Sequence, residues 1–136
     1  MKKLKAVIDT NILVSALLGS RTCKDIILSF ERQAFTLVLT DALVKEIKEV
    51  LLDREIGEFS GHDLERLFKV LARQAEVVRP MTSLRLCRDP EDDKILEAAL
   101  ASGADFIVTR DKDLLVLKSL DKTLIIRPEE FIKILQ

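Results

Sequence analysis

Two aspartates follow short apolar runs that have the composition of β-strands. Asp9 comes directly after the run at residues 5–8, and Asp111 comes two residues after the run at residues 105–109. Runs that are apolar at every position are typical of strands covered on both faces in a parallel sheet. Ligands of such sheets bind at the carboxyl ends of the strands. Each aspartate alone is explained equally well as the N-cap of a helix, but the pair predicts a functional site at this edge.

A third acid, Glu46, lies in a segment with helical periodicity. The apolar residues of segment 41–52 form one stripe, and Glu46 lies at the edge of that stripe rather than on the opposite, solvated arc. Placing a carboxylate against protein costs free energy, so we interpret Glu46 as a functional residue. The alternative is a boundary glutamate whose stem packs on the protein while its head reaches solvent.

The segment CRDPEDDKILEAALASG contains several acids that must be distinguished from one another. Asp89, followed by proline, predicts the start of a helix, and Gly103 predicts its end. Glu91 and Asp92 fit the first turn, where the helix dipole and a capping box favour acids. Asp93 lies on the flank of the apolar stripe and has no such local explanation. We therefore select Asp93 as the functional acid, with Asp92 as its rival.

The selected acids come from two strand ends and two helices that are expected to meet at one crevice: Asp9, Glu46, Asp93 and Asp111. Carboxylates held close together repel one another, so they take up protons or bind a cation. Oxygen ligands without histidine or cysteine suit Mg²⁺ or Mn²⁺. The sole histidine, His62, lies in a polar interval at residues 53–62, which argues against a zinc site or a Ser-His-Asp triad. The set predicts a metal centre for phosphodiester chemistry.

The elements that must position these acids alternate along the chain. With 136 residues, of which 48% are hydrophobic, the chain has the size of a single domain spanning residues 1–136. Helical segments separate the strand-like runs, which predicts an α/β fold with a parallel sheet between helical layers. The predicted strands are at residues 5–8, 35–39, 75–79, 105–109 and 123–127.

The charge balance excludes general attraction to nucleic acid. There are 22 basic and 23 acidic residues, giving a formal net charge of -1, so any polyanion must be held locally. Arg85, Arg88, Arg110 and Lys112 flank the selected acids and are candidates for contacts with a phosphate backbone. The alternative for each of them is an ordinary solvated surface charge.

Cysteine usage and the N-terminal sequence point to the cytoplasm. Cys23 and Cys87 are too few and too widely spaced for a disulfide framework or a zinc site, and we interpret them as reduced structural thiols. The first apolar stretch is short and interrupted by Asp9, so neither a signal peptide nor a membrane span is expected.

Four blocks of the sequence resemble, in order and spacing, those of the PIN-domain ribonucleases, particularly the VapC-like toxin components of toxin–antitoxin systems. The blocks are VIDTNILVSAL, LVKEIKEVL, CRDPEDDKILEAAL and ADFIVTRDKDLL. The resemblance implies a three-layer α/β/α sandwich with a five-stranded parallel sheet. It also implies a metal-dependent endoribonuclease that uses Mg²⁺ or Mn²⁺ to cleave single-stranded RNA.

The resemblance also assigns roles to individual residues and implies partners. The metal ligands that it implies are Asp9, Glu46, Asp93 and Asp111. Accessory positions beside the metal are Thr10, Asn11, Thr109 and Asp113, with Asp92 replacing Asp93 if the two adjacent acids exchange roles. Homodimers and an antitoxin that covers the active-site groove are the expected protein partners, and no membrane is expected.

Two other functional classes place acids at the ends of parallel strands. Acidic-site phosphohydrolases of the halo-acid-dehalogenase type need a second aspartate two positions after the first, where this chain has Asn11. Phosphoacceptor switch domains need a lysine after a late strand, where this chain reads VTRD. A catalytically inactive RNA-binding PIN module is the remaining alternative, although the complete acid set argues against it.

Overall fold

The secondary structure alternates between strands and helices from Lys5 onward. The computed structural model describes residues 3–53, 57 and 59–136. In chain order the elements are β1 (Lys5–Ile8), α1 (Thr10–Leu17), α2 (Arg21–Glu31), β2 (Thr36–Leu39), α3 (Asp41–Leu51), α4 (Gly61–Gln74), β3 (Glu76–Val77), α5 (Pro90–Ser102), β4 (Phe106–Val108), α6 (Lys112–Leu115), β5 (Ser119–Leu120), β6 (Thr123–Ile126) and α7 (Pro128–Leu135).

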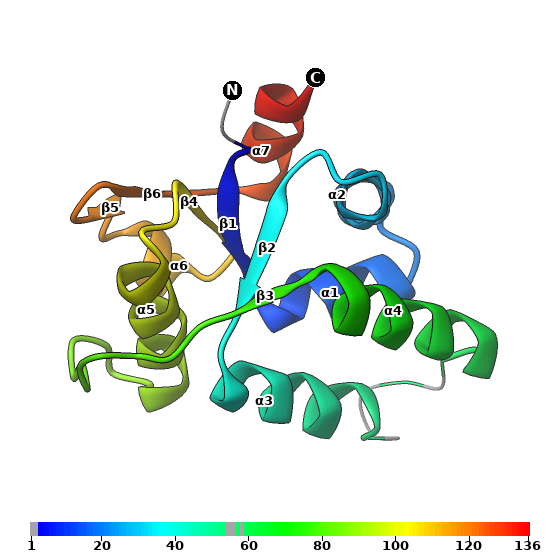
Figure 1. Cartoon of the computed structure of the whole chain (residues 1–136), viewed down its shortest axis with the longest axis horizontal. Helices are drawn as coiled ribbons and strands as arrows, with labels where there is room; N and C mark the ends of the chain where they lie inside the picture. The colour runs from blue at the N-terminus through cyan, green and yellow to red at the C-terminus, as the bar shows by residue number, and fades with distance from the viewer. Residues whose placement is uncertain (1–2, 54–56, 58) are drawn as a thin grey trace.

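The strands form one sheet in the order β3-β2-β1-β4-β6-β5 (Figure 1). Every neighbouring pair is parallel except β5 and β6, which form an antiparallel hairpin. The predicted α/β fold and its predicted strands are confirmed, but the sheet has six strands rather than five. The additional strand, Ser119–Leu120, is only two residues long and has no apolar run that periodicity could detect.

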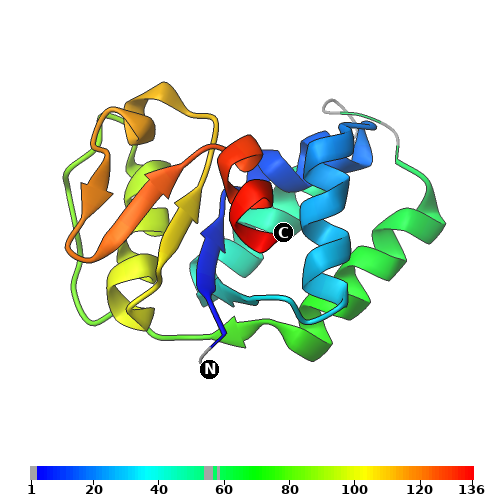
Figure 2. The same cartoon turned by 90° about the horizontal axis from the view of Figure 1, so that it is seen from above.

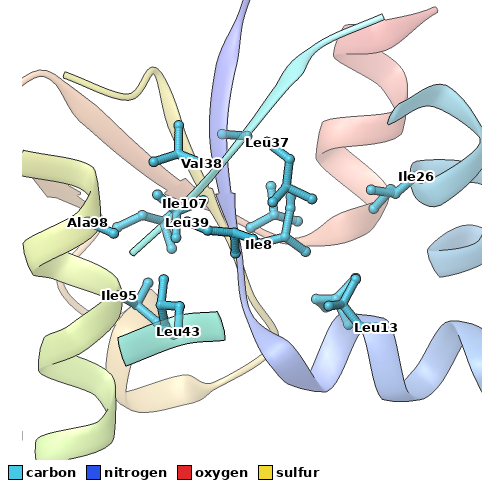
Figure 3. Close-up of a cluster of buried hydrophobic side chains, with 14 of the residues drawn as sticks. Ile8, Leu13, Ile26, Leu37, Val38, Leu39, Leu43, Ile95, Ala98 and Ile107 are labelled. Atoms are coloured by element: carbon cyan, nitrogen blue, oxygen red, sulfur yellow. The ribbon is translucent and has the colours of Figure 1, made fainter. Parts of the chain in front are cut away.

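Helices cover both faces of this sheet. Phe106 and Ile107 are adjacent in β4, so their side chains point to opposite faces. Helix α5 packs on β1, β2 and β4, and Figure 3 shows its Ala98 close to Ile107. On the other face, the Phe106 ring lies 5.8 Å from the ring of Phe131 in α7. Figure 2 shows α7 beside α2, against which it packs. The result is the layered α/β/α arrangement.

Helix α5 brings its acids to the sheet because its limits and its packing face are both well defined. The Asp89 side chain accepts a hydrogen bond from the Glu91 amide at 2.9 Å, and Gly103 ends the helix with a φ of 64°. Leu96, Ala98 and Ala99 are fully buried, and the small alanines let the helix lie close to the strands. The predicted start and end of this helix are confirmed.

The polar interval predicted as a loop, residues 53–62, falls between α3 and α4. Helix α3 ends at Leu51 and α4 begins at Gly61, while residues 54–56 and 58 lie outside the described part of the chain. Among the described helices, none combines the length and the apolar composition that a membrane crossing requires.

The strand order changes direction between β1 and β4. The chain extends the sheet from β1 to β2 and β3, then returns to the other side of β1 to form β4. Connections leaving β1 and β4 therefore diverge at their carboxyl ends, which is the point where ligands bind in sheets of this kind. Asp9 follows β1 at this edge, and Thr109 follows β4.

Candidate metal centre

Asp9 is held in place by hydrogen bonds to both of its carboxylate oxygens. Its Oδ1 accepts from the Asn11 amide at 3.2 Å, which caps α1, and its Oδ2 accepts from the Thr109 hydroxyl at 2.7 Å. Only 7% of Asp9 is exposed. Burial raises the pKa of Asp9, nearby Asp111 raises it further, and the bonds from Thr109 and Asn11 oppose the increase. Asp9 is therefore both a helix cap and a constrained carboxylate at the carboxyl end of β1.

Thr109 connects the ends of β1 and β4. Its side chain is fully buried, and its Oγ1 accepts a hydrogen bond from the Asp111 amide at 3.0 Å while donating to Asp9. Asp111 in turn accepts from the Asp113 amide at 2.9 Å and caps α6. One hydroxyl thus fixes the relative positions of Asp9 and the chain segment that carries Asp111.

Three carboxylates meet at this edge of the sheet. Oxygens of Asp92, Asp111 and Asp113 all lie within 4.8 Å of one another. Asp92 comes from the first turn of α5 and is only 8% exposed. Its pKa is raised to about 7, first by burial and then by Asp111, with smaller contributions from Asp89 and Asp9. We call Asp92, Asp111 and Asp113 the carboxylate cluster.

Glu46 lies on the α3 side of Asp9 and is half-buried. The Thr10 hydroxyl donates to its Oε2 at 2.9 Å. Burial raises the pKa of Glu46, and the charges of Glu91 and Asp9 raise it further, while the bond from Thr10 lowers it. Thr10, predicted as an accessory residue, therefore orients Glu46. Asn11 is exposed and contributes its backbone amide to Asp9.

Asp93, the acid selected from the sequence, points to a different part of the chain. Its Oδ1 accepts from the backbone amides of Leu86 at 3.0 Å and Cys87 at 2.9 Å, and only 5% of Asp93 is exposed. Adjacent residues on a helix point about 100° apart. Asp92 therefore faces Asp111 while Asp93 faces the segment that precedes α5.

Two side chains near Glu46, those of Glu91 and Lys94, were not selected from the sequence. Glu91 raises the pKa of Glu46, and its Oε2 accepts from the Lys94 ammonium at 2.7 Å. That hydrogen bond is the main reason why the pKa of Glu91 is lowered. The signal that could have found Glu91 is the run of three acids after Pro90, more than capping requires.

The basic candidates are exposed, and Arg88 contacts the cluster. Arg88 donates to Asp113 Oδ1 at 3.0 Å, and Arg110 lies 3.4 Å from Glu129 Oε2. Arg85 and Lys112 are exposed.

Both cysteines are free, and burial together with Asp93 raises the pKa of Cys87 to about 11.

The donor set fits a hard divalent cation. All of its groups are carboxylates, which Mg²⁺ and Mn²⁺ prefer to soft ligands. Burial and then the charge of Asp111 raise the pKa of Asp92, and a bound cation would favour its ionised form. Asp92, Asp111 and Asp113 are the residues whose spacing could hold the ion, with Asp9 beside them.

Comparison with known proteins shows the family of this chain. The family described as PIN domain matches residues 5–113. The chain belongs to the PIN-domain family. Uncharacterized protein MJ1680 of Methanocaldococcus jannaschii is 33% identical over 144 residues, covering 96% of this chain and 91% of that protein.

The PIN domain is also similar in fold to a chain in a crystal structure of VapBC2 from Rickettsia felis bound to a DNA fragment from their promoter. The TM-score is 0.58, with 91% of this chain and 98% of that chain covered. Only 11% of the aligned residues are identical, so the likeness concerns the fold.

The raised pKa values predict that the metal-free PIN domain becomes less stable as the pH rises. Asp9, Glu46 and Asp92 bind protons more tightly in the folded than in the unfolded chain, so their contribution is fully present only below their ordinary pKa values, 3.8 for Asp and 4.5 for Glu, and is lost as the pH rises through the raised folded-state values. We expect the Tm in EDTA to fall by several degrees between about pH 5 and about pH 8. Thermal denaturation followed by circular dichroism measures this.

Two further thermal denaturation experiments test the origin of this pH dependence. Mn²⁺ should raise the Tm more at the higher pH, because ion binding requires deprotonated carboxylates. Asp92→Asn should flatten the metal-free profile, since Asp92 has the pKa that is raised to about 7. A metal-free Tm that rises over this pH range would contradict the proposed electrostatic balance.

Proposed function

We propose that this PIN domain is a Mg²⁺- or Mn²⁺-dependent endoribonuclease that hydrolyses phosphodiester bonds in single-stranded RNA. The observation that carries the proposal is the carboxylate cluster, whose oxygens lie within 4.8 Å of one another at the carboxyl edge of the sheet. Family membership supports a nuclease but does not define the substrate. The chemistry of the donor set supports a metal-assisted reaction at a phosphate.

Four acids form the proposed site. Asp9, Asp92 and Asp111 are the proposed ligands, and Asp113 is a more exposed member of the cluster. Glu46 supports the site from the α3 side through its proximity to Asp9. In this proposal Asp92 takes the role for which the sequence favours Asp93, because Asp92 is the acid that faces Asp111.

The mechanism depends on orientation and charge. A bound divalent ion would lower the pKa of a water molecule and offset charge on the phosphate oxygens. The Thr109 hydroxyl fixes the orientation of the Asp9 carboxylate, and the Thr10 hydroxyl does the same for Glu46. Its raised pKa makes Glu46 a stronger proton acceptor than an ordinary glutamate.

Substrate binding is assigned to the basic side chains around the cluster. Arg85, Arg88, Arg110 and Lys112 are exposed, as contacts with a phosphate backbone require. Such contacts release counterions, so RNA affinity should fall with increasing salt. Because the net charge is only -1, binding would depend on these local charges.

The role of toxin in a toxin–antitoxin pair is part of the same proposal. It is supported by the resemblance of the sequence blocks to VapC-like proteins and by the shared fold with a chain of VapBC2. An antitoxin that covers the site, a homodimer and a cytoplasmic location belong to this proposal.

The decisive experiment is a cleavage assay with labelled single-stranded RNA, Mg²⁺ or Mn²⁺, and an EDTA control. Asp9→Asn should reduce cleavage by roughly a thousand-fold, because it removes a charged proposed ligand. Asp25→Asn, at an exposed position of α2, is the matched control and should retain wild-type activity. Release of phosphate from a small ester with RNA intact would indicate a phosphohydrolase. Binding of RNA without cleavage would indicate an inactive RNA-binding module.

A further inference from the structure

Two acids of α5 hold the backbone of the segment that precedes this helix. Asp93 Oδ1 accepts from the amides of Leu86 at 3.0 Å and Cys87 at 2.9 Å. One turn later, Glu97 Oε1 accepts from the amide of Leu84 at 2.9 Å. Residues four apart lie on the same face of a helix. Asp93 and Glu97 therefore form a carboxylate clamp on residues 84–87.

The clamp is important because this segment has little other backbone support. No helix or strand lies between Val77 and Pro90. Among the described residues, no amide of residues 79–88 donates to a backbone carbonyl. Hydrogen bonds to a carboxylate are stronger than those to neutral acceptors. The three bonds of the clamp thus join the backbone of this segment to α5, in addition to the packing of Leu84 and Cys87 against the core.

The clamped segment carries two of the basic candidates, Arg85 and Arg88. Arg85 lies between the anchored amides of Leu84 and Leu86, and Arg88 directly follows the anchored Cys87. Arg88 reaches the carboxylate cluster, where it donates to Asp113 Oδ1 at 3.0 Å. The position of the backbone at residues 84–88 therefore determines where both guanidinium groups lie relative to the cluster.

We infer that Asp93 is a positioning residue: together with Glu97 it holds residues 84–88 so that Arg85 and Arg88 contact the RNA phosphates next to the metal-binding acids. This inference rests on the proposed function and specifies how the same site holds its substrate. Asp93 acts through the backbone amides of Leu86 and Cys87, whereas Asp92 acts directly at the cluster.

Paired substitutions separate a positioning role from a ligand role. Asp93→Asn removes the charge but keeps an acceptor oxygen for the amides of Leu86 and Cys87, whereas Asp93→Ala removes both. A metal ligand would lose Mn²⁺ affinity in both variants. We expect Mn²⁺ affinity, measured by isothermal titration calorimetry, to change by less than about three-fold in either variant, while Asp92→Asn weakens it by roughly a hundred-fold.

RNA kinetics give the second readout. Asp93→Ala should raise KM for single-stranded RNA about ten-fold with kcat reduced less than about three-fold, because two phosphate contacts lose their fixed position. Asp93→Asn should have a KM close to the wild-type value, because its side-chain oxygen can still accept from the two amides. Glu97→Ala, which removes the other half of the clamp at a less buried position, should raise KM in the same direction. A fall in kcat with unchanged KM in Asp93→Ala would overturn the inference.

Hydrogen exchange tests the clamp without reference to catalysis. In the metal-free protein, the Leu86 and Cys87 amides should exchange at least about ten-fold faster in Asp93→Ala than in the wild type, as should the Leu84 amide in Glu97→Ala. Unchanged exchange would show that the clamp does not hold the segment, and loss of Mn²⁺ binding in Asp93→Asn would show that Asp93 is a ligand. If the wild-type protein neither binds nor cleaves RNA, the proposed function fails, and so does the role of the clamp in substrate binding. The exchange rates of the Leu84, Leu86 and Cys87 amides would still show whether the clamp holds the segment.

Discussion

Replacing Asp92 with asparagine is expected to lower the rate of RNA cleavage by roughly a thousand-fold while raising the stability of the metal-free protein. The two effects have one cause. Asp92 is 8% exposed and lies within 4.8 Å of the oxygens of Asp111 and Asp113, so its charge opposes folding when no ion is bound. The same charge is needed to hold the ion on which the proposed reaction depends.

The test measures single-turnover cleavage with Mn²⁺ and the Tm in EDTA at about pH 8. The asparagine variant should be nearly inactive with a Tm several degrees above that of the wild type, because uncharged asparagine removes the repulsion from Asp111. Asp25→Asn should change neither quantity. A variant that loses stability together with activity would show that Asp92 is a structural anchor and not a ligand.

Replacing Thr109 with valine is expected to reduce cleavage by about ten- to a hundred-fold and to lower the free energy of unfolding by about 1–3 kcal/mol. Valine has nearly the same shape, so packing around this fully buried side chain is preserved. What is lost is the hydroxyl that donates to Asp9 at 2.7 Å and accepts from the Asp111 amide at 3.0 Å. Asp9 would then lose its orientation, and the Asp111 amide would lose its partner.

Thr123 provides the matched control for this substitution. It is also a buried threonine, and its hydroxyl donates to the Ala104 carbonyl at 2.6 Å, at the start of β6. Thr123→Val should destabilise the fold by a similar amount and leave kcat close to the wild-type value. Thr109→Ser retains the hydroxyl and should recover most of the activity. Equal losses of activity in the two valine variants would indicate a general effect of stability and contradict the specific role of Thr109.

The sequence alone was sufficient for the fold class and for the edge of the sheet where the site lies. Strands β1 and β4 are buried on both faces, so their apolar runs were visible without any tertiary information. Asp9 follows β1 directly and Asp111 comes three residues after the end of β4, so their location at the carboxyl edge follows from the geometry of parallel sheets. The limits of α5 were equally clear, because Asp89 and Gly103 act through local hydrogen bonding and backbone conformation.

Elements with weak local signals were not predictable in the same way. Strand β5 has two residues and is defined by its pairing with β6, so the sheet gained a strand that periodicity did not show. Glu91 was explained by the helix dipole, although its carboxylate also acts on Glu46 in another helix. The deciding interaction of β5 is its pairing with β6, and that of Glu91 is its contact with Glu46 in α3. Neither interaction can be inferred from the residues of β5 or of the first turn of α5 alone.

The sequence by itself determined an α/β fold with acids at the ends of β1 and β4, because strand burial and helix capping are local properties of the chain. Only the tertiary structure decided the directions of Asp92 and Asp93. Both flank the buried stripe of α5, and periodicity cannot distinguish neighbours when each has a partner outside the helix. Asp92 is oriented toward Asp111 beyond β4, and Asp93 toward the amides of Leu86 and Cys87. Those partners reach α5 only when the sheet and the segment before the helix have packed around it.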